Sequence, residues 1–528
     1  MKETINLSKS DLTDEQKEQL LDVLAEHREA FSLDSELGNC QLLDHEISLK
    51  PGTRPIYQRP YRYSMFSNNE ARKHVSGLLE KGVIEPSTSP WSSPICIVTK
   101  PRSDPNAPVE TRMTIDYRKL NDQTLPDVHP LPRLDDMIDR IGNENPLYFS
   151  TIDLLSGFFQ VNLDPKSRPK TAFSFEGGHY QFTKLAQGLK NSPASFSRLM
   201  QLILSGIQYF ICLCYIDDII IFSRTFEDHL KHIGMVLQRL VKANVKAKPQ
   251  KCQFGCQEIR FLGNILSKDG VKPDPAKTAI IKDMPPPKTV KQLRRCLGLM
   301  GFYRRFVPNF QVHARHLYKL LQNDVKWEWS DKCQAGFESL RDALVNAPVL
   351  GYPDFEKPFL VYTDASYDGF GAMLVQEQEC NGETIKRAIW YAGRSLNKHE
   401  KNYTATDLEI AAVYYAVLQF RPYLRHNRVI FHTDHQALTS LLDCKQPTGR
   451  LGRIHQTISM LDHDIVHVAG TKMAHVDAIS RFPHLSLPKE FEDPVDPDFI
   501  NPQLVEPKSS EDLKAFAINS KETVYQLP

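Results

Sequence analysis

The sequence predicts a multidomain α+β protein, and three observations support this fold class. Short apolar segments alternate with helical patterns from about residue 70 to residue 265. A proline run from Asp283 to Pro287 then interrupts the chain, and the residues up to about Asn346 show helical spacing alone. Phe359 to Thr363 reads as a strand that opens a further α/β unit ending near Arg481. The length of 528 residues with 41% hydrophobic content fits about three to four globular domains.

Taken in order, the elements begin with an amphipathic helix over residues 11 to 31, which we interpret as a small N-terminal appendage. Arginines and tyrosines interleave from Pro51 to Tyr63, a pattern that suits either nucleic-acid stacking or an ordinary surface strap. Residues beyond Phe482 are rich in proline and acids and predict a linker. In the alternating region the predicted strands are 95–98, 113–115, 148–152, 159–163, 209–214 and 219–222.

Charge is balanced overall, so net charge neither favours nor excludes a polyanionic partner. The chain has 65 Lys and Arg against 64 Asp and Glu. Basic residues nevertheless collect locally, in 242–251 and in 288–319, and neither stretch contains an acid. The ten cysteines form no disulfide framework, which predicts a reducing compartment. Cys252 and Cys256 lack a second ligand pair at zinc-finger spacing, so we expect buried thiols there.

The most informative segment is the hairpin predicted around Tyr215-Ile-Asp-Asp218, which joins two apolar strands. The two carboxylates would lie at its tip, where they repel each other unless solvent or a cation neutralises them. The stretch is too short, and too charged at its centre, to span a membrane. Asp-Asp pairs are common in solvated turns, so this motif alone leaves turn chemistry and metal binding equally open.

A third carboxylate favours the metal interpretation. Tyr148 to Asp153 reads as a strand that ends in an acid. Three aspartates on two neighbouring strands could hold two Mg²⁺ ions, because hard cations prefer carboxylate oxygens. Two such ions suit an in-line displacement, in which one activates the attacking oxygen and the other stabilises the leaving oxygen.

These segments resemble the reverse transcriptase of gypsy-type LTR-retrotransposon Pol polyproteins, from roughly His45 to Arg481. Five motifs occur in the family order: Arg112-Met-Thr-Ile-Asp-Tyr-Arg-Lys-Leu-Asn121, Ser150-Thr-Ile-Asp-Leu-Leu-Ser-Gly157, Gln187-Gly-Leu-Lys-Asn-Ser-Pro193, Tyr215-Ile-Asp-Asp218 and Phe261-Leu-Gly263. The chain departs from the pattern in one place. It has Leu185-Ala-Gln-Gly188, which is closer to the retroviral form than to the usual gypsy Pro-Phe-Gly.

The resemblance assigns roles to individual residues of the polymerase centre. Asp153, Asp217 and Asp218 are the expected metal ligands and catalytic acids. Arg112 and Lys100 are expected to hold the triphosphate, with strand-surface charge as the alternative for Arg112. Further substrate-binding residues implied by the family are Gln187 at the sugar and base, Phe158 under the sugar, and Phe261, Leu262 and Gly263 at the primer end. Phe158 would exclude a ribose 2′-hydroxyl, although Phe159 could take this role in another register.

A second set of acids follows in the C-terminal unit and resembles ribonuclease H. Asp364, Glu409, Asp434 and Asp477 are the expected catalytic residues and metal ligands, each at or near the end of an element. Thr406 and Glu409 also match a helix capping box. Met473 stands where the family usually has Asn, and Gly470 lies where many ribonucleases H carry His, so a weakened activity is expected.

The resemblance also implies an architecture. It predicts a right-hand polymerase of fingers, palm and thumb, followed by an RNase H-like α/β domain. The expected boundaries are 1–50 for the N-terminal appendage, 51–265 for fingers and palm, 266–350 for a helical thumb, 351–482 for RNase H and 483–528 for the tail. Basic residues of the thumb would contact the backbone of a hybrid duplex: Lys291, Arg294, Arg295, Arg304 and Arg305.

The implied function is RNA- and DNA-directed DNA polymerisation with RNase H cleavage of the hybrid. It would use two Mg²⁺ ions per active site, with Mn²⁺ as a substitute. The implied partners are an RNA template, a DNA primer, an RNA:DNA hybrid and dNTPs, with a homodimer on the substrate as one arrangement and no membrane. The expected location is cytoplasmic virus-like particles, with the nucleus as an alternative. Protease and integrase motifs are lacking, which predicts a central portion of Pol. The rival interpretations are a nucleic-acid-binding relic without chemistry and a two-metal phosphoesterase alone.

Overall fold

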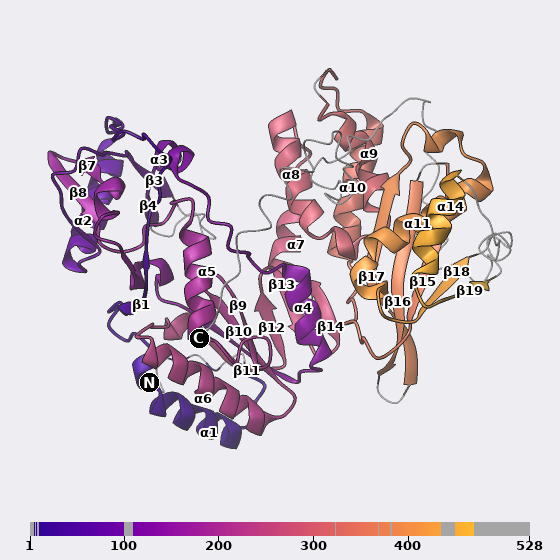
Figure 1. Ribbon diagram of the computed structural model, residues 1–528, viewed down its shortest axis with the longest axis horizontal. Coiled ribbons are helices and arrows are strands. Elements are labelled where there is room, and N and C mark those ends of the chain that lie inside the picture. The colour runs from indigo at the N-terminus through magenta and orange to yellow at the C-terminus, as the bar shows by residue number, and fades with distance from the viewer. Residues whose placement is uncertain are drawn as a thin grey trace, which may run out of the picture.

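The computed structural model describes residues 5, 7, 10–99, 109–322, 324–367, 369–380, 383–433 and 449–468. These residues form a row of lobes, with the N-terminal half at one end of Figure 1 and the last sheet at the other. The predicted α+β class is confirmed by this mixture of helices and sheets. No helix in the described ranges is long and apolar enough to cross a membrane.

The N-terminal segment packs onto the next lobe and shares its core. Helix α1 (Asp14–Glu26) begins at Thr13, which closes a capping box with Gln16. Its buried Leu20 and Leu24 join the same core cluster as α6 (Phe226–Lys242). Strand β1 (Cys40–His45) pairs in parallel with β6 (Val161–Leu163). The predicted helix is therefore present, and its segment packs on α6, one of the helices around the palm.

The first lobe contains small sheets covered by short helices. Strands β3 (Ile95–Thr99) and β4 (Thr111–Ile115) form one pair, and β2 (Ile84–Pro86), β8 (Gly178–Phe182) and β7 (Phe173–Phe175) form another sheet in that order. The helices and turns here are α2 (Met65–Glu80), α3 (Arg118–Gln123), η1 (Arg28–Ala30) and η3 (Arg168–Thr171). The strap residues Tyr61 and Tyr63 donate hydrogen bonds to Asp116 and to the carbonyl of Ile95, which holds the strap along β3 and β4.

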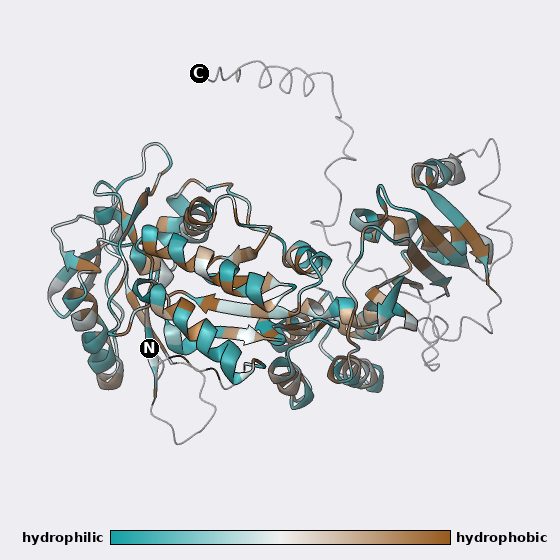
Figure 2. Ribbon diagram, turned by 90° about the horizontal axis from the view of Figure 1, so that it is seen from below, coloured by the Kyte–Doolittle hydropathy of each residue, from teal (hydrophilic) through white to brown (hydrophobic). Residues whose placement is uncertain are grey.

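A four-stranded sheet with the order β11-β5-β10-β9 forms the centre of the molecule, and we call it the palm sheet. Its strands are β11 (Gln253–Cys256), β5 (Tyr148–Asp153), β10 (Asp218–Ser223) and β9 (Cys212–Tyr215). The helices around it are α4 (Leu134–Asn143), α5 (Ser192–Ile203) and α6, with the turns η2 (Gly157–Gln160) and η4 (Pro249–Lys251). Figure 2 shows apolar strands at this position and polar outer faces on the neighbouring helices.

Two predicted strands of this region were too long. The strand expected over 209–214 begins only at Cys212, because Tyr209 has a positive φ of 73° and Phe210 is 65% exposed. Phe159 and Gln160, expected in a strand, lie in the 3-10 turn η2 instead. Cys252 and Cys256 are buried, as the sequence predicts.

A three-stranded sheet and a helical segment follow. The sheet has the order β12 (Glu258–Phe261), β13 (Asn264–Ser267) and β14 (Gly270–Pro273). We call the next part the helical segment: α7 (Pro275–Lys282), α8 (Val290–Phe302), η5 (Arg304–Phe306), α9 (Phe310–Lys319) and α10 (Asp331–Val345). Leu293, Leu297 and Met300 of α8 enter the core that this segment shares with α4 and the β12–β14 sheet.

The last lobe, which we call the C-terminal domain, is a five-stranded mixed sheet with the order β17-β16-β15-β18-β19. Its strands are β15 (Phe359–Ala365), β16 (Gly369–Cys380), β17 (Glu383–Ser395), β18 (Val429–Thr433) and β19 (His463–His467). The helices are α11 (Ala405–Gln419), α12 (Arg421–Leu424) and α14 (Gly449–Ser459), with the turn η6 (Glu400–Asn402). Helix α11 is apolar over most of its surface and packs on β15 and β16.

Candidate active sites

The Tyr215-Ile-Asp-Asp218 segment forms the predicted hairpin between β9 and β10. Tyr215 pairs with Asp218 across the two strands, so Ile216 and Asp217 make a two-residue turn. Ile216 has a φ of 57°, which is an unfavourable conformation for a β-branched residue. The flanking strands are buried in the core, and they hold the turn in this strained shape.

The palm sheet brings the third aspartate to the same place. Strand β5 runs antiparallel to β10, and Asp153 is the register partner of Asp218. Burial, together with the neighbouring Asp217 and Asp153, raises the pKa of Asp218 to about 6. Burial also raises the pKa of Asp217, with Asp153 adding to the effect. Three acids that disfavour one another's charge have the donor chemistry of a site for a divalent cation.

Lys251 provides the positive charge at this site in the structure. Its Nζ lies 3.2 and 3.1 Å from the two carboxylate oxygens of Asp153. The adjoining turn is fixed by the amide of Lys248, which donates to the carbonyl of Asp153. Within the described ranges no group of three or more His, Cys, Asp and Glu side chains is already close enough to bind a metal ion. Lys251 falls in the basic run seen in the sequence, but its pairing with Asp153 required the fold.

A buried hydrogen-bond chain lies behind the aspartates and was missed in the sequence. His229 of α6 contacts Ser150 of β5 through Nε2 at 2.7 Å and Ser223 of β10 through Nδ1 at 2.9 Å. The Gly255 amide also donates to Ser150, which links β11 to the same group. Burial lowers the pKa of His229 to about 3, so the ring is neutral near pH 7. This chain joins both strands that carry the aspartates.

The predicted nucleotide contacts lie on the first lobe. Arg112 is exposed on β4, opposite Val98 of β3. Gln187 is half-buried in a turn that Asn121 closes, because the Asn121 amide donates to the carbonyl of Gly188. Lys100 lies outside the described residues. Asn121 therefore positions the turn that carries Gln187, a role that the motif alone does not indicate.

The two candidate aromatic residues under the sugar point to different neighbours. The ring of Phe158 lies 5.1 Å from that of Phe196, whereas Phe159 stacks on Phe182 of the first lobe. The adjoining Gly157 is close to the β9–β10 turn, since a Cβ built there would be 3.6 Å from the Cβ of Asp217 and 2.8 Å from the ring of Phe196. Phe158 therefore packs on the same ring, Phe196, that lies against Gly157.

Phe261, Leu262 and Gly263 form the tight turn between β12 and β13. Leu262 and Gly263 have φ values of 47° and 84°, so this turn uses the left-handed region twice. Tyr303, from the turn after α8, donates a hydrogen bond of 2.7 Å to the carbonyl of Gly263. The helical segment is thus fastened directly to the turn predicted to grip the primer end.

Of the four acids predicted for the nuclease site, the structure describes two in the C-terminal domain: Asp364 on β15 and Glu409 on α11. The amide of Ala365 donates to a carboxylate oxygen of Glu409 at 3.3 Å, so the two acids come from adjoining elements at one end of β15. Strand β18 runs parallel to β15 and ends at Thr433, the residue before Asp434. Asp434 and Asp477, as well as Gly470 and Met473, lie outside the described residues. The predicted capping box was wrong: α11 is capped by Thr404, whose hydroxyl accepts from the amide of Asp407.

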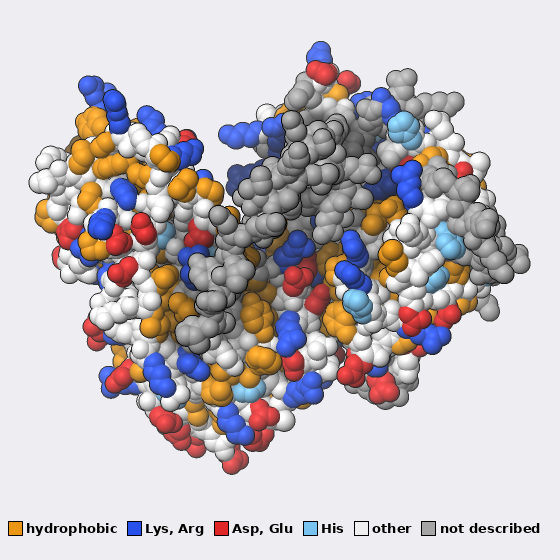
Figure 3. Space-filling model, in the orientation of Figure 1, with side chains coloured by type: hydrophobic (Ala, Val, Ile, Leu, Met, Phe, Trp, Pro, Cys, Tyr) orange, Lys and Arg blue, Asp and Glu red, His pale blue; other side chains and the backbone are white. Residues whose placement is uncertain are grey.

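Basic side chains of α8 face the hollow between the first lobe and the helical segment, which Figure 3 shows at the upper edge of the molecule. Lys291, Arg294 and Arg295 are exposed on this helix, and Arg304 is exposed just after it. Arg305 is only 5% exposed, so the prediction that it contacts a duplex was wrong. Its side chain points instead to α4 and β17.

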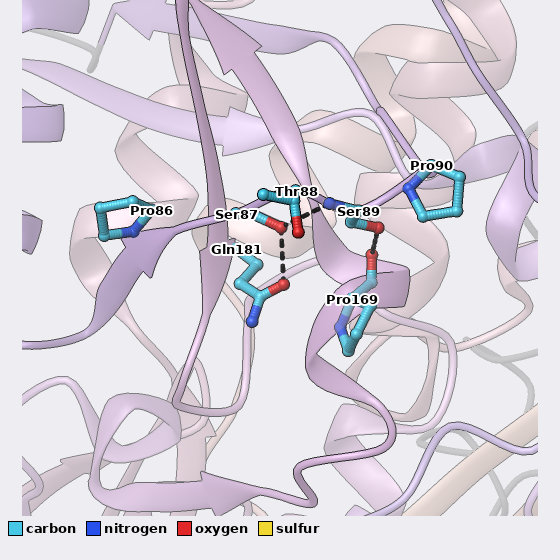
Figure 4. A pocket seen from close by; sticks show the side chains of 7 residues that line it. All are labelled: Pro86, Ser87, Thr88, Ser89, Pro90, Pro169 and Gln181. Atoms are coloured by element: carbon cyan, nitrogen blue, oxygen red, sulfur yellow. Dashed lines mark hydrogen bonds between the residues drawn. The ribbon is translucent and has the colours of Figure 1, made fainter.

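A separate hollow of about 490 Å³ lies at the edge of the first lobe and is lined by Pro86, Ser87, Thr88, Ser89, Pro90, Pro169 and Gln181. Figure 4 shows that its hydroxyl groups bond to the wall: Ser87 donates to Gln181, and Ser89 donates to the carbonyl of Pro169. It contains none of the predicted catalytic acids.

Two protein families match separate parts of the chain. The reverse transcriptase (RNA-dependent DNA polymerase) family matches residues 99–266, and the RNase H-like domain found in reverse transcriptase matches residues 329–431. Domains of both kinds generally use divalent metals. The fold and its two acidic sites therefore define a reverse transcriptase domain followed by an RNase H-like domain.

The individual proteins that resemble this chain are retrovirus-related Pol polyproteins. The chain is 36% identical over 467 residues to the retrovirus-related Pol polyprotein from transposon 412 of Drosophila melanogaster, covering 88% of this chain and 37% of the relative. It is 33% identical over 481 residues to that from transposon gypsy of the same organism, covering 89% and 46%. The chain is similar to this group of Pol polyproteins over most of its own length, and it carries reverse transcriptase and RNase H-like domains. It spans less than half the length of these two relatives.

Solved structures agree with this family. A foamy viral protease-reverse transcriptase in complex with dsDNA superposes with a TM-score of 0.75 at 25% identity, covering 88% of this chain and 96% of the other. A complex of the foamy viral protein with RNA/DNA hybrid has a TM-score of 0.71 at 24% identity, covering 93% and 64%. The predicted family and the predicted order of polymerase and nuclease folds are confirmed, while the exact domain boundaries stay predictions.

Proposed function

We propose that this protein is an RNA- and DNA-directed DNA polymerase that also cleaves the RNA strand of RNA:DNA hybrids during retrotransposon replication. The observation that carries the proposal is the register of the palm sheet. Asp153 and Asp218 face each other across β5 and β10, and Asp217 lies in the adjoining turn.

The acids fit a pair of Mg²⁺ ions, with Mn²⁺ as a substitute. Their mutual repulsion and burial would be relieved by divalent cations, which would supply Lewis-acid stabilisation of charge at the attacking and leaving oxygens. Asp153, Asp217 and Asp218 would hold the ions in the palm. Asp364, Glu409, Asp434 and Asp477 would do so in the nuclease. Lys251 must leave Asp153 or share it when cations enter, since both compete for the same oxygens.

The remaining predicted contacts support dNTPs, a primer and a template as partners. Exposed Arg112 can pair with phosphate, and the ring of Phe158, which lies against Phe196, would exclude a ribose 2′-hydroxyl. The basic face of α8 suits the backbone of a duplex, and binding there should weaken as salt rises. The foamy viral relative forms complexes with dsDNA and with RNA/DNA hybrid, which supports the same partners here.

The first prediction concerns the polymerase acids. The double variant Asp217→Asn, Asp218→Asn should lose roughly a thousandfold or more of primer extension, because it removes charge stabilisation worth several kcal/mol. Extension of a labelled primer on RNA and DNA templates with Mg²⁺ measures this. Asp22→Asn, an exposed acid on α1, is the matched control and should extend normally.

The same assay separates the rival functions. A relic that only holds duplex would bind the hybrid with salt-dependent affinity, yet the parent protein would neither extend nor cut. A phosphoesterase alone would cut without extending. Glu409→Gln should abolish hybrid cleavage and leave extension intact, because Glu409 of α11 contacts the end of β15 in the C-terminal domain and is not part of the palm. Extension by the double variant at the parent's rate would refute the assigned polymerase site.

A further inference from the structure

A partly buried polar junction joins three parts of the chain. It consists of α4 before the palm sheet, η5 of the helical segment, and β17 with α12 of the C-terminal domain. The residues that form it are Asp135, Asp139, Arg305, Trp390 and Tyr423. We call it the three-way junction. Figure 1 shows α4 beside the β12–β14 sheet, between the palm and the C-terminal domain.

The centre of the junction is a hydrogen bond between two buried residues. Tyr423 of α12 donates to Oδ2 of Asp139 at 2.5 Å. Tyr423 is held in place by aromatic neighbours of its own domain, stacking on Phe355 and contacting Phe359. Asp139 lies on the buried face of α4, so its direction is fixed by the packing of that helix. Neither side chain can move without breaking other contacts.

Arg305 forms the second link. Its Nη1 donates to Asp135 of α4 at 2.8 Å, and its guanidinium lies over the ring of Trp390 in β17 at 4.7 Å. The arginine comes from the turn that follows Tyr303, the residue bonded to Gly263 at the predicted primer grip. One side chain therefore contacts the palm, the helical segment and the C-terminal domain.

The junction is polar at a cost. Oδ1 of Asp139 and Nε of Arg305 are buried and have no hydrogen-bond partner in the described part of the chain. Unpaired buried polar atoms cost about 1–3 kcal/mol each, which apolar residues at these positions would avoid. A polar, directional contact stands where an apolar contact would be more stable. This favours a role in fixing the position of the C-terminal domain relative to the palm.

The elements at the junction lead directly to both sets of catalytic acids. Helix α4 precedes β5, which ends at Asp153. Helix α12 follows α11, which carries Glu409. The Asp139–Tyr423 hydrogen bond thus connects the helix before the polymerase strand to the helix after the nuclease acid.

We infer that the three-way junction sets the distance between the polymerase and nuclease sites, and so fixes where RNA is cut relative to the primer end. The inference rests on the proposed function. Asp139, Arg305 and Tyr423 are positioning residues, because none of them lies at either acidic site. Loss of the junction lets the C-terminal domain shift along the hybrid while each site keeps its own chemistry.

The test uses an RNA strand labelled at its 5′ end and annealed to a recessed DNA primer, without dNTPs. The full protein places the primer end at the polymerase site, and Mg²⁺ starts cleavage. The parent should give one dominant cut position. Arg305→Ala and Tyr423→Phe should spread the cuts over neighbouring positions, so that the share of the dominant product falls at least about threefold. Arg428→Ala removes an exposed ion pair with Asp464 inside the same domain and should keep the parent pattern.

Extension on a DNA template shows that each variant is folded, and Tyr423→Phe is a single-atom change if Arg305→Ala does not fold. Small-angle X-ray scattering of the free proteins supplies a readout without activity: junction variants should have a larger maximum dimension than the parent. A sharp parent-like cut position in an extending Tyr423→Phe variant overturns the inference. If the parent does not cut hybrid at all, the proposed nuclease function fails, and unchanged scattering of the junction variants then overturns the inference separately.

Discussion

At the scale of single residues, neighbours in the sequence have different roles because the backbone turns between them. Phe158 and Phe159 are adjacent in η2, yet one ring meets Phe196 and the other meets Phe182. Arg304 and Arg305 are likewise adjacent, and one is exposed while the other is buried. The type of residue predicts which contacts its side chain could make, but the direction of the side chain decides which of these contacts it does make.

Phe158 gives the prediction at this scale. Phe158→Ala should raise incorporation of ribonucleotides relative to deoxynucleotides by roughly ten- to a hundredfold, because it opens space for the 2′-hydroxyl. Phe159→Ala should leave this ratio near the parent value, since its ring packs on Phe182. Single-nucleotide incorporation with rNTP and dNTP at matched concentrations measures both ratios. A larger change in Phe159→Ala than in Phe158→Ala would show that Phe159, and not Phe158, excludes the 2′-hydroxyl.

At the scale of elements, turns between strands hold the predicted functional groups, and contacts from elsewhere hold the turns. The β9–β10 turn carries Asp217 on a strained Ile216, and the β12–β13 turn is held by Tyr303. Glu409 shows the same dependence, because its helix is capped by Thr404, two residues before the Thr406 of the predicted capping box. Local sequence signals placed these elements well but their end residues less well.

Two glycines near α8 give the prediction for this scale. Gly263→Ala should lower the free energy of unfolding by about 1 kcal/mol or more, because φ is 84° and the new Cβ would lie 3.3 Å from Oη of Tyr303. Gly298→Ala, in the interior of α8 with open space around the new Cβ, should raise it by about 0.5–1 kcal/mol. Urea unfolding of both variants measures the difference. Equal effects would show that the β12–β13 turn is not under this constraint.

At the scale of the whole molecule, the C-terminal domain is attached to the palm by contacts as well as by the chain. Arg305 and the Asp139–Tyr423 pair make this attachment polar and specific. The RNase H-like family match begins at residue 329, just before α10, whereas the predicted boundary is 351. This overlap agrees with a helical segment that packs against both the palm and the C-terminal domain.

The junction also predicts a pH dependence of stability. Burial raises the pKa of Asp139 from 3.8 to about 6, with Arg305 and the hydrogen bond from Tyr423 opposing this shift and Asp135 and Asp136 adding to it. The protonated carboxyl therefore favours the folded state. This contribution is complete below about pH 4 and is lost as pH rises to about 6, an effect of about 3 kcal/mol.

Chemical unfolding between pH 4 and pH 7 tests this contribution. The stability of the parent relative to Asp139→Asn should fall as pH rises through this window, because asparagine cannot ionise. All other titrating groups are common to both proteins, so they cancel in the difference. A difference that stays flat with pH, or rises, would show that Asp139 is not held in its protonated form.

The sequence by itself determined the fold class, the family resemblance, the order of the two domains and which acids are the candidates for catalysis. These depend on patterns that are visible along the sequence without the fold: apolar spacing, turn residues and five short motifs in order. Tertiary structure alone decided that Asp153 faces Asp218, that Lys251 pairs with Asp153, that Phe158 meets Phe196 whereas Phe159 meets Phe182, and that Arg305 is buried. The reason is physical, since register, burial and pairing between distant segments arise only when packed strands and helices fix the directions of their side chains.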